Sequence, residues 1–161
     1  MSDEVEYQDG CIRNLDTQDL IDINRWMIQS FTPREPIGVL NPENLEMAQQ
    51  KPTVVKYVCQ TTDMALLAAE LMHAIARLHA FHNANKRTAI ASAIIFLRMN
   101  GYQCTPPVAE GLNICEGIVL GHYETAEVAD WLASHSSASD SAGLAHDTMF
   151  MILGEHFDEQ D

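Results

Sequence analysis

Residues that could bind a phosphate and move a proton are gathered in the stretch HAFHNANKRT, residues 79–88. The stretch lies between an amphipathic segment and an uncharged apolar one, so it is predicted to join the end of one helix to the start of the next. The free N–H groups and the dipole of a helix start favour an anion, and Lys86 and Arg87 add positive charge there. The planar guanidinium of Arg87 could hold two phosphate oxygens, Lys86 could supply a point charge, and Asn85 could donate an amide hydrogen bond.

His79, at the beginning of the same stretch, is the candidate base. An imidazole titrates near neutral pH and could accept a proton from an incoming hydroxyl group. A base beside a phosphate site indicates the transfer of part of a nucleotide to a hydroxyl group.

The same side chains also have plainer interpretations. A histidine at a helix end is commonly a surface or capping residue, and a Lys-Arg pair in a first helical turn is commonly solvated. Three histidines, His73, His79 and His82, could ligate a metal, but no carboxylate or cysteine pattern typical of a metal site accompanies them. Phe81 is most simply a core side chain that fixes the loop.

The elements that must position this stretch are predicted to be helices, with almost no strand. Apolar residues recur at helical spacing, and Asp16 or Thr17, Asn41 and Thr125 are candidate N-caps. The helices are predicted within residues 14–31, 41–51, 63–78, 89–97, 106–121 and 125–135. The sequence therefore predicts an all-α fold.

Two of these helices have distinctive features. The helix at 41–51 is expected to be short, with Pro42 in its first turn. The segment 89–97 carries no charge on any face, so we expect it in the middle of the bundle, ended by a left-handed Asn100–Gly101 pair.

The chain is expected to form one helical domain over residues 1–135, followed by a distinct segment over 136–161. The stretch SHSSASDSA, residues 134–142, is typical of a flexible linker. After it, Met149, Phe150, Ile152 and Leu153 predict one short apolar helix before an acidic tail. The sequence leaves open whether this helix packs on its own body, on a second copy, or stays mobile.

The composition argues against several partners and sites. With 23 acidic against 9 basic residues, the net charge of −14 disfavours nucleic acid and anionic membranes. The four cysteines are scattered without a C-x-x-C pair, which is typical of reduced thiols. The acidic start lacks an apolar segment, and no apolar run approaches the roughly 18 residues that span a bilayer, so we expect a cytoplasmic protein.

The stretch HAFHNANKR resembles the signature of the Fic/Doc superfamily, H-x-F-x-(D/E)-(G/A)-N-(G/K)-R. The matching positions are His79, Phe81, Ala84, Asn85, Lys86 and Arg87. GVLNPENLEMAQQKP and KRTAIASAIIFLRMNGY are similar to two further family segments. The resemblance implies a helical bundle around a buried central helix. Ala84, Lys86 and the short length are closest to Doc, the death-on-curing toxins of toxin–antitoxin modules.

The resemblance implies a role for each motif residue. His79 would be the general base that deprotonates a Ser, Thr or Tyr hydroxyl of a target protein, with Phe81 and Ala84 structural. Asn83, Asn85, Lys86 and Arg87 would hold the phosphates of ATP or another nucleotide. Most relatives transfer AMP, whereas Doc transfers the terminal phosphate to a translation elongation factor, and Lys86 favours this kinase-like reaction.

The resemblance also implies a regulator. The family's inhibitory (S/T)-x-x-x-E-(G/N) pattern is not matched at Glu110, Glu116 or Glu155. Inhibition is therefore expected from a separate antitoxin that lays a helix into the groove over the site. The oligomeric state is left open.

One position departs from the family pattern. Asn83 stands where the family has the Asp or Glu that holds Mg²⁺, and a neutral amide is a poorer ligand for this cation. Two hypotheses follow: a protein-modifying transferase whose Mg²⁺ is held less strongly, or a catalytically silent module that binds a nucleotide or a protein. A plain helical interaction domain is the third alternative.

Overall fold

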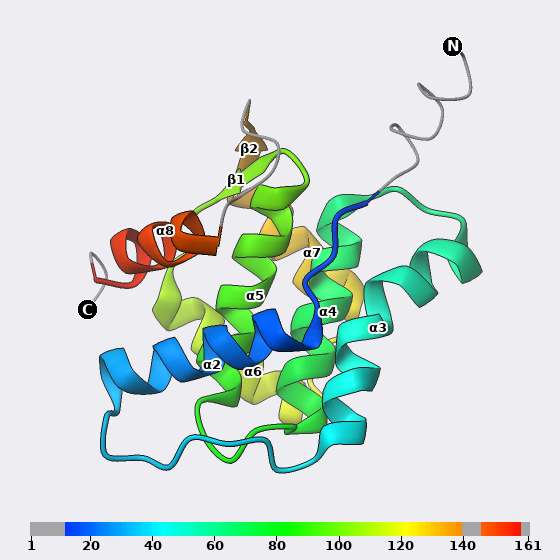
Figure 1. Ribbon diagram of the computed structural model, residues 1–161. Helices are drawn as coiled ribbons and strands as arrows, with labels where there is room; N and C mark the ends of the chain where they lie inside the picture. Colours follow the sequence, from blue (N-terminus) through cyan, green and yellow to red (C-terminus); the bar gives the residue numbers. More distant parts are fainter. Residues whose placement is uncertain (1–11, 140–145, 159–161) are drawn as a thin grey trace.

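The computed structural model describes residues 12–139 and 146–158 and confirms the all-α prediction. Helices make up nearly all of the regular structure in these ranges, and the two short strands form one small sheet (Figure 1). In chain order the elements are α2 (Thr17–Phe31), α3 (Pro42–Cys59), α4 (Met64–Leu78), α5 (Asn85–Met99), β1 (Tyr102–Cys104), α6 (Val108–Val119), α7 (Thr125–Ser134), β2 (Ser136–Ala138) and α8 (His146–Asp158).

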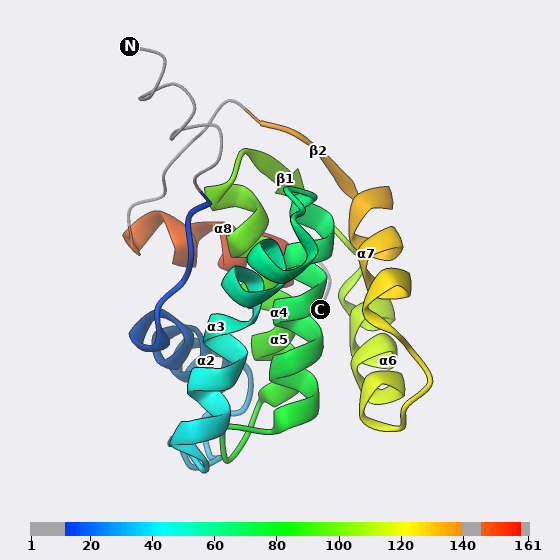
Figure 2. The same ribbon diagram turned by 90° about the vertical axis from the view of Figure 1, so that its right-hand side faces the viewer.

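Helix α5, which contains the uncharged stretch 89–97, is the buried centre of the bundle, as the sequence predicted. Every residue from Thr88 to Leu97 is buried, and α2, α4, α6 and β1 pack around it. Figure 2 shows α6 and α7 on one side of α4 and α5 and α2 on the other. Small residues such as Ala89 and Ala93 let neighbouring helices approach closely. The end of α5 that follows the motif loop is therefore held rigidly.

Several helices begin where their capping residues predict. Asp16 accepts a hydrogen bond from Asp19 N at 2.7 Å, and Asn41 accepts one from Asn44 N at 3.0 Å. The cap predicted at Thr125 is wrong: Glu124 is the N-cap of α7, and its N–H donates to Glu127 Oε1 at 3.1 Å. The reciprocal pairing of Glu124 and Glu127 begins the helix one residue earlier.

Helix α3 is longer than the short helix that the sequence predicted. It has 18 residues and continues through Pro52 to a left-handed Gln60 with φ 49°. Proline removes one helical hydrogen bond, but here its ring is buried together with Ala48, which lies one turn earlier. Burial against α4 therefore keeps the helix continuous past the proline.

The serine-rich segment begins with Ser134, the last residue of α7, and forms a strand over residues 136–138, so the linker prediction is wrong for these residues. β2 pairs antiparallel with β1, with Tyr102 opposite Ala138 and Cys104 opposite Ser136. Ser139 N also donates to Gly101 O at 2.8 Å, where Gly101 turns the chain with φ 93°. The ladder depends on β1, which is distant in the sequence. Residues 140–142 of the predicted linker lie outside the described residues.

Helix α8 confirms the predicted apolar helix and packs on its own body, beside α5 and above α2 in Figure 1. Met149, Leu153 and Phe157 recur at four-residue spacing and are buried. Phe150 stacks on Trp26 with ring centroids 6.0 Å apart. The division of the chain at residue 135 stays a prediction. No helix in the described ranges combines the length and apolar character that a membrane crossing requires.

Candidate functional site

The motif loop between α4 and α5 is bounded by two residues in the left-handed conformation. His79 ends α4 with φ 51° and ψ 53°, and Ala84 precedes α5 with φ 60° and ψ 28°. This conformation costs a residue with a Cβ about 1–2 kcal/mol of conformational energy, so the surrounding contacts must hold the loop in place. Such strain is concentrated at functional sites.

Two hydrogen bonds between the Asn85 side chain and the Phe81 backbone hold the motif loop together from within. Asn85 Oδ1 accepts a hydrogen bond from Phe81 N at 3.0 Å, and Asn85 Nδ2 donates to Phe81 O at 2.9 Å. Phe81 is only 1% exposed. Because both atoms of the Asn85 amide are engaged, this side chain shapes the loop. A direct contact between Asn85 and a phosphate stays a prediction that requires these bonds to open or uses the backbone N–H.

A second segment, residues 32–41, runs alongside the motif loop. Gly38 O accepts from His82 N at 3.0 Å, and Ala80 O accepts from Leu40 N at 2.7 Å. The Asn83 side chain donates from Nδ2 to Pro36 O at 2.9 Å. The segment therefore forms one wall beside the loop, and Asn83 ties the two together.

The buried side chain of Asn24 holds the motif loop in place, and the sequence analysis did not predict this role. This residue of α2 is 1% exposed, and its Nδ2 donates to Asn83 O at 2.8 Å and to Thr88 Oγ1 at 3.1 Å. The sequence carries a signal for it, because an asparagine lies on the apolar face of α2 next to Ile23. A polar side chain on a buried face needs a partner, and here the partner is the motif loop.

An open pocket of about 410 Å³ lies over the loop and the start of α5. Except for the buried Phe81, the predicted site residues line it together: His79, Asn83, Ala84, Asn85, Lys86 and Arg87. The pocket wall also includes residues that the motif could not identify: Thr32, Glu35, Ala76, His82, Leu112 and Val119. The structure thus assembles the motif into one cavity whose outer walls come from the 32–41 segment and α6.

The predicted base is accessible, whereas the other histidines do not form a metal site with it. His79 is exposed at the end of α4 and faces the pocket. The His73 ring lies elsewhere, with Nε2 3.3 Å from Tyr123 O. Among the described residues, no three His, Cys, Asp or Glu side chains gather closely enough to hold a metal ion.

The two cations of the motif are in different environments. Lys86 Nζ is 3.4 Å from Glu116 Oε2, but the side chains are 43% and 65% exposed, so this ion pair contributes little and opens easily. The guanidinium of Arg87 lies over the Phe31 ring, with Cζ 4.9 Å from the centroid. Arg87 Nη1 is buried and has no hydrogen-bond partner among the described residues. A buried donor of this kind is stabilised by an anionic ligand.

Comparison with known proteins agrees with this geometry. The model of the Fic/DOC family matches residues 14–97, slightly more than half of the chain. The chain belongs to the Fic/DOC family. It is also 40% identical over 75 residues to protein kinase doc of Escherichia phage P1, a match that covers 45% of this chain and 57% of that relative. The match thus spans little more than half of the relative's length.

The Fic/DOC region contains the motif loop, the 32–41 segment, Asn24 and Phe31. Helices α6, α7 and α8 lie beyond residue 97. Leu112 and Val119, which line the pocket, and Glu116, the ion-pair partner of Lys86, therefore come from outside the matched region.

A buried thiol lies directly beneath the Fic/DOC motif. Cys115 Sγ is 3.8 Å from Lys86 O, its hydrogen-bond acceptor. Burial raises the pKa of Cys115 to about 12, and the nearby Lys86 lowers it by a smaller amount. The thiol is therefore protonated at neutral pH and acts as a packing group, not a nucleophile.

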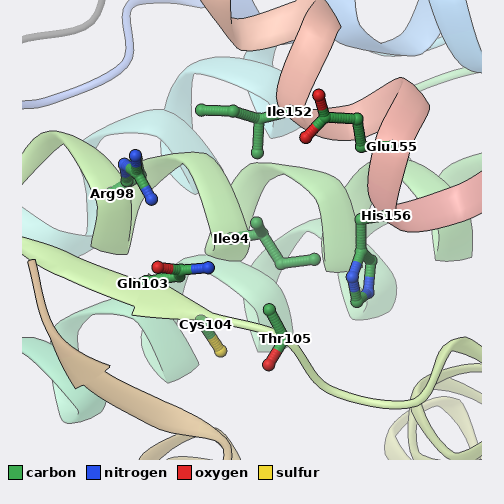
Figure 3. A pocket seen from close by; sticks show the side chains of 8 residues that line it. All are labelled: Ile94, Arg98, Gln103, Cys104, Thr105, Ile152, Glu155 and His156. Atoms are coloured by element: carbon green, nitrogen blue, oxygen red, sulfur yellow. The ribbon is translucent and has the colours of Figure 1, made fainter.

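A second pocket, of about 260 Å³, lies between α8, β1 and the end of α5 and contains no motif residue (Figure 3). In this view Arg98 lies at one end and His156 at the other, with Ile152 and Glu155 above them on α8. Arg98 Nε is buried, and no described residue forms a hydrogen bond with it. The pocket combines charges of both signs with an apolar wall at Ile94, so its shape and charge indicate no single class of ligand.

Proposed function

We propose that this chain is a Doc-like toxin of a toxin–antitoxin module that transfers the terminal phosphate of ATP to a hydroxyl group of a target protein. The observation that carries the proposal is the position of His79, exposed in the same pocket as Lys86 and Arg87. The kinase name of the phage P1 relative supports phosphate transfer as the reaction. A translation elongation factor is the expected target, and the cytoplasm is the expected location.

The phosphates bind at the start of α5. The backbone N–H groups of the first turn and the helix dipole attract them, and Lys86 and Arg87 supply two positive charges. Arg87 is the stronger anchor, because its buried Nη1 has no acceptor in the part of the chain that the structure describes and its planar fork suits two phosphate oxygens. Lys86 leaves its exposed pair with Glu116 and turns to the phosphates at small cost.

His79 acts as the general base. Its imidazole accepts the proton of a Ser, Thr or Tyr hydroxyl while the hydroxyl oxygen bonds to the terminal phosphorus of ATP. The bond between that phosphorus and the bridging oxygen breaks, and ADP leaves. The left-handed turn at His79 places the imidazole at the end of α4, where a protein substrate can reach it.

Magnesium is the cation that the family resemblance implies, and the pocket offers a weaker donor set for it than the family motif. Asn83 Nδ2 donates a hydrogen bond to Pro36 O, so Asn83 Oδ1 is the side-chain atom that could bind a cation. Glu35 is the carboxylate of the adjacent segment that lines the same pocket. These two side chains would hold a hydrated Mg²⁺ together with the phosphates. When bound, the ion neutralises phosphate charge.

A catalytically silent module that binds a nucleotide or a protein is the second candidate, and Asn83 is the observation that favours it. Without the motif carboxylate, binding persists while transfer becomes slow. In either case the expected inhibitor is an antitoxin supplied by a separate chain.

The test is a labelling reaction with purified protein, Mg²⁺ and a bacterial lysate. ATP is labelled at the α phosphate in one reaction and at the γ phosphate in the other. His79→Ala is the key variant, and His122→Ala, an exposed histidine after α6, is its matched control.

The proposal expects His79-dependent label on a protein band from γ-labelled ATP alone. Label from the α position would indicate AMP transfer instead. The absence of any label that depends on the added protein would favour the silent module. Label that depends on the added protein but persists in His79→Ala would contradict both candidates.

A further inference from the structure

The Phe31 ring, at the end of α2, contacts both the motif and the C-terminal helix. On one side the Arg87 guanidinium lies over it, with Cζ 4.9 Å from the ring centroid. Phe157 of α8 packs against the same ring, with centroids 6.0 Å apart and planes at 49°. Trp26 meets it edge to face at 6.1 Å. Phe31 therefore links α8 to a cation of the candidate site.

Two aromatic side chains of α8 pack against aromatic side chains of α2. Phe150 and Phe157 are seven residues apart, two helical turns, and so lie on one face of α8. Phe150 stacks on Trp26 at 6.0 Å with planes at 26°, and Phe157, fully buried, packs on Phe31. Phe157 thus contacts Phe31 directly, and Phe150 reaches it through Trp26.

Arg87 depends on this ring for its orientation. Its Nη1 is buried without a hydrogen-bond partner, and no carboxylate among the described residues forms an ion pair with it. An arginine side chain has many rotamers, so a guanidinium without polar partners must be fixed by packing. The face of Phe31 supplies that packing through a cation–π contact.

We infer that α8 is a positioning element for the phosphate site: through Phe157 it holds the Phe31 ring in the place where that ring orients Arg87. The inference rests on the proposed role of Arg87 in phosphate binding. Since α8 lies outside the Fic/DOC region, the chain carries its own support for a motif residue. α8 acts through Phe31, because the pocket lining contains none of the α8 side chains that the structure describes.

The test compares substitutions at two positions in α8. Phe157→Ala removes the ring that packs on Phe31, with Phe157→Leu as a milder variant that keeps most of the apolar volume. Leu153→Ala is the matched control, because Leu153 is also fully buried in α8 but contributes no ring to the stack. The ATP dissociation constant is measured by calorimetry for each variant that remains folded.

A second readout reports on Arg87 without any nucleotide. The Nε–Hε resonance of Arg87, assigned by its loss in Arg87→Lys, carries a ring-current shift while the guanidinium lies over Phe31. We expect Phe157→Ala and Phe157→Leu to move this resonance and Leu153→Ala to leave it in place. We expect Phe157→Ala to weaken ATP binding about fivefold, against less than about twofold for Leu153→Ala.

Three outcomes would overturn the inference: an unmoved Arg87 resonance in both Phe157 variants, unchanged ATP affinity in both, or an equal loss of affinity in Leu153→Ala. If the wild-type protein binds no ATP, the proposed function fails by itself. The Arg87 resonance of the ligand-free variants then still decides whether Phe157 orients Arg87.

Discussion

The side-chain amide of Asn85 is hydrogen-bonded through both of its polar atoms to the backbone of Phe81, at 3.0 Å and 2.9 Å. The two hydrogen bonds lie inside the motif loop, where Asn85 is 5% exposed and Phe81 is 1% exposed. The loop must hold two left-handed residues, His79 and Ala84, and this internal link offsets part of their strain. The motif asparagine is thus a structural requirement of the site before any ligand binds.

Replacing Asn85 by alanine is expected to destabilise the protein. The substitution leaves Phe81 N and Phe81 O buried without partners, which costs about 2–4 kcal/mol of unfolding free energy for the two groups. Chemical denaturation of Asn85→Ala measures it. Asn113→Ala, an exposed asparagine of α6, is the control and should change stability by less than about 0.5 kcal/mol. Equal stability of the two variants would contradict the structural role of Asn85.

Glycine at either of two left-handed positions is expected to stabilise the fold. Ala84 has φ 60° and Gln60 has φ 49°. Relief of the Cβ strain, about 1 kcal/mol, exceeds the added unfolded-state entropy of glycine, so each variant should gain a few tenths of a kcal/mol. Thermal unfolding measures the gain. Gln60→Gly, at the end of α3 and far from the motif in the chain, serves as the reference for Ala84→Gly; a loss of stability in both would show that the left-handed strain is absent.

The sequence predicted the elements whose signals are local. Asp16 and Asn41 cap helices with their own side chains, and the uncharged stretch at 89–97 can only be buried. The prediction failed where distant contacts decide. α3 continues past Pro52 because tertiary burial compensates for the lost hydrogen bond, and residues 136–138 form a strand because β1 lies beside them.

The candidate site divides in the same way. The motif identified His79, Lys86 and Arg87, since they lie within one loop and its following helical turn. Glu35 lines the same pocket from the segment beside the loop, and Leu112 comes from α6. Neither has a spacing relation to the motif, so only the folded chain brings them together.

The cysteines provide a test of the core beneath the motif. Burial raises the pKa of Cys115 to about 12, so at pH 8 the thiol is protonated and unreactive, whereas Cys59 is exposed. We expect alkylation at pH 8 to label Cys59 in the native protein and Cys115 only after unfolding, as read by mass spectrometry. Rapid native labelling of Cys115 would show that the region under Lys86 opens.

The same burial has a consequence for stability at high pH. The raised pKa of Cys115 means that the folded state retains a proton which the unfolded chain loses above its ordinary value of 9.0. The stability that this neutral thiol provides is complete below pH 9 and falls as the pH rises from there toward 12. Substitution by Ser or Ala removes this part of the pH dependence, which denaturation at pH 8 and pH 10 measures.

The substitution Asn83→Asp separates the two candidate functions. It places a carboxylate where the family motif has one, but it removes the Nδ2 donor to Pro36 O, so a loss of about 1 kcal/mol of stability is expected. Cation affinity should rise, as measured by Mn²⁺ titration with electron paramagnetic resonance. Gln29→Glu, which adds the same charge to an exposed position of α2, controls for the change in net charge.

The labelling reaction with Asn83→Asp then distinguishes the two functions. A working enzyme already transfers phosphate with Asn83, so its His79-dependent label should change only a few-fold. A silent module should gain label that the wild-type protein lacks. If Asn83→Asp raises cation affinity and neither form labels a protein, the missing carboxylate at position 83 does not explain the lack of phosphate transfer. The pocket is then a binding site alone.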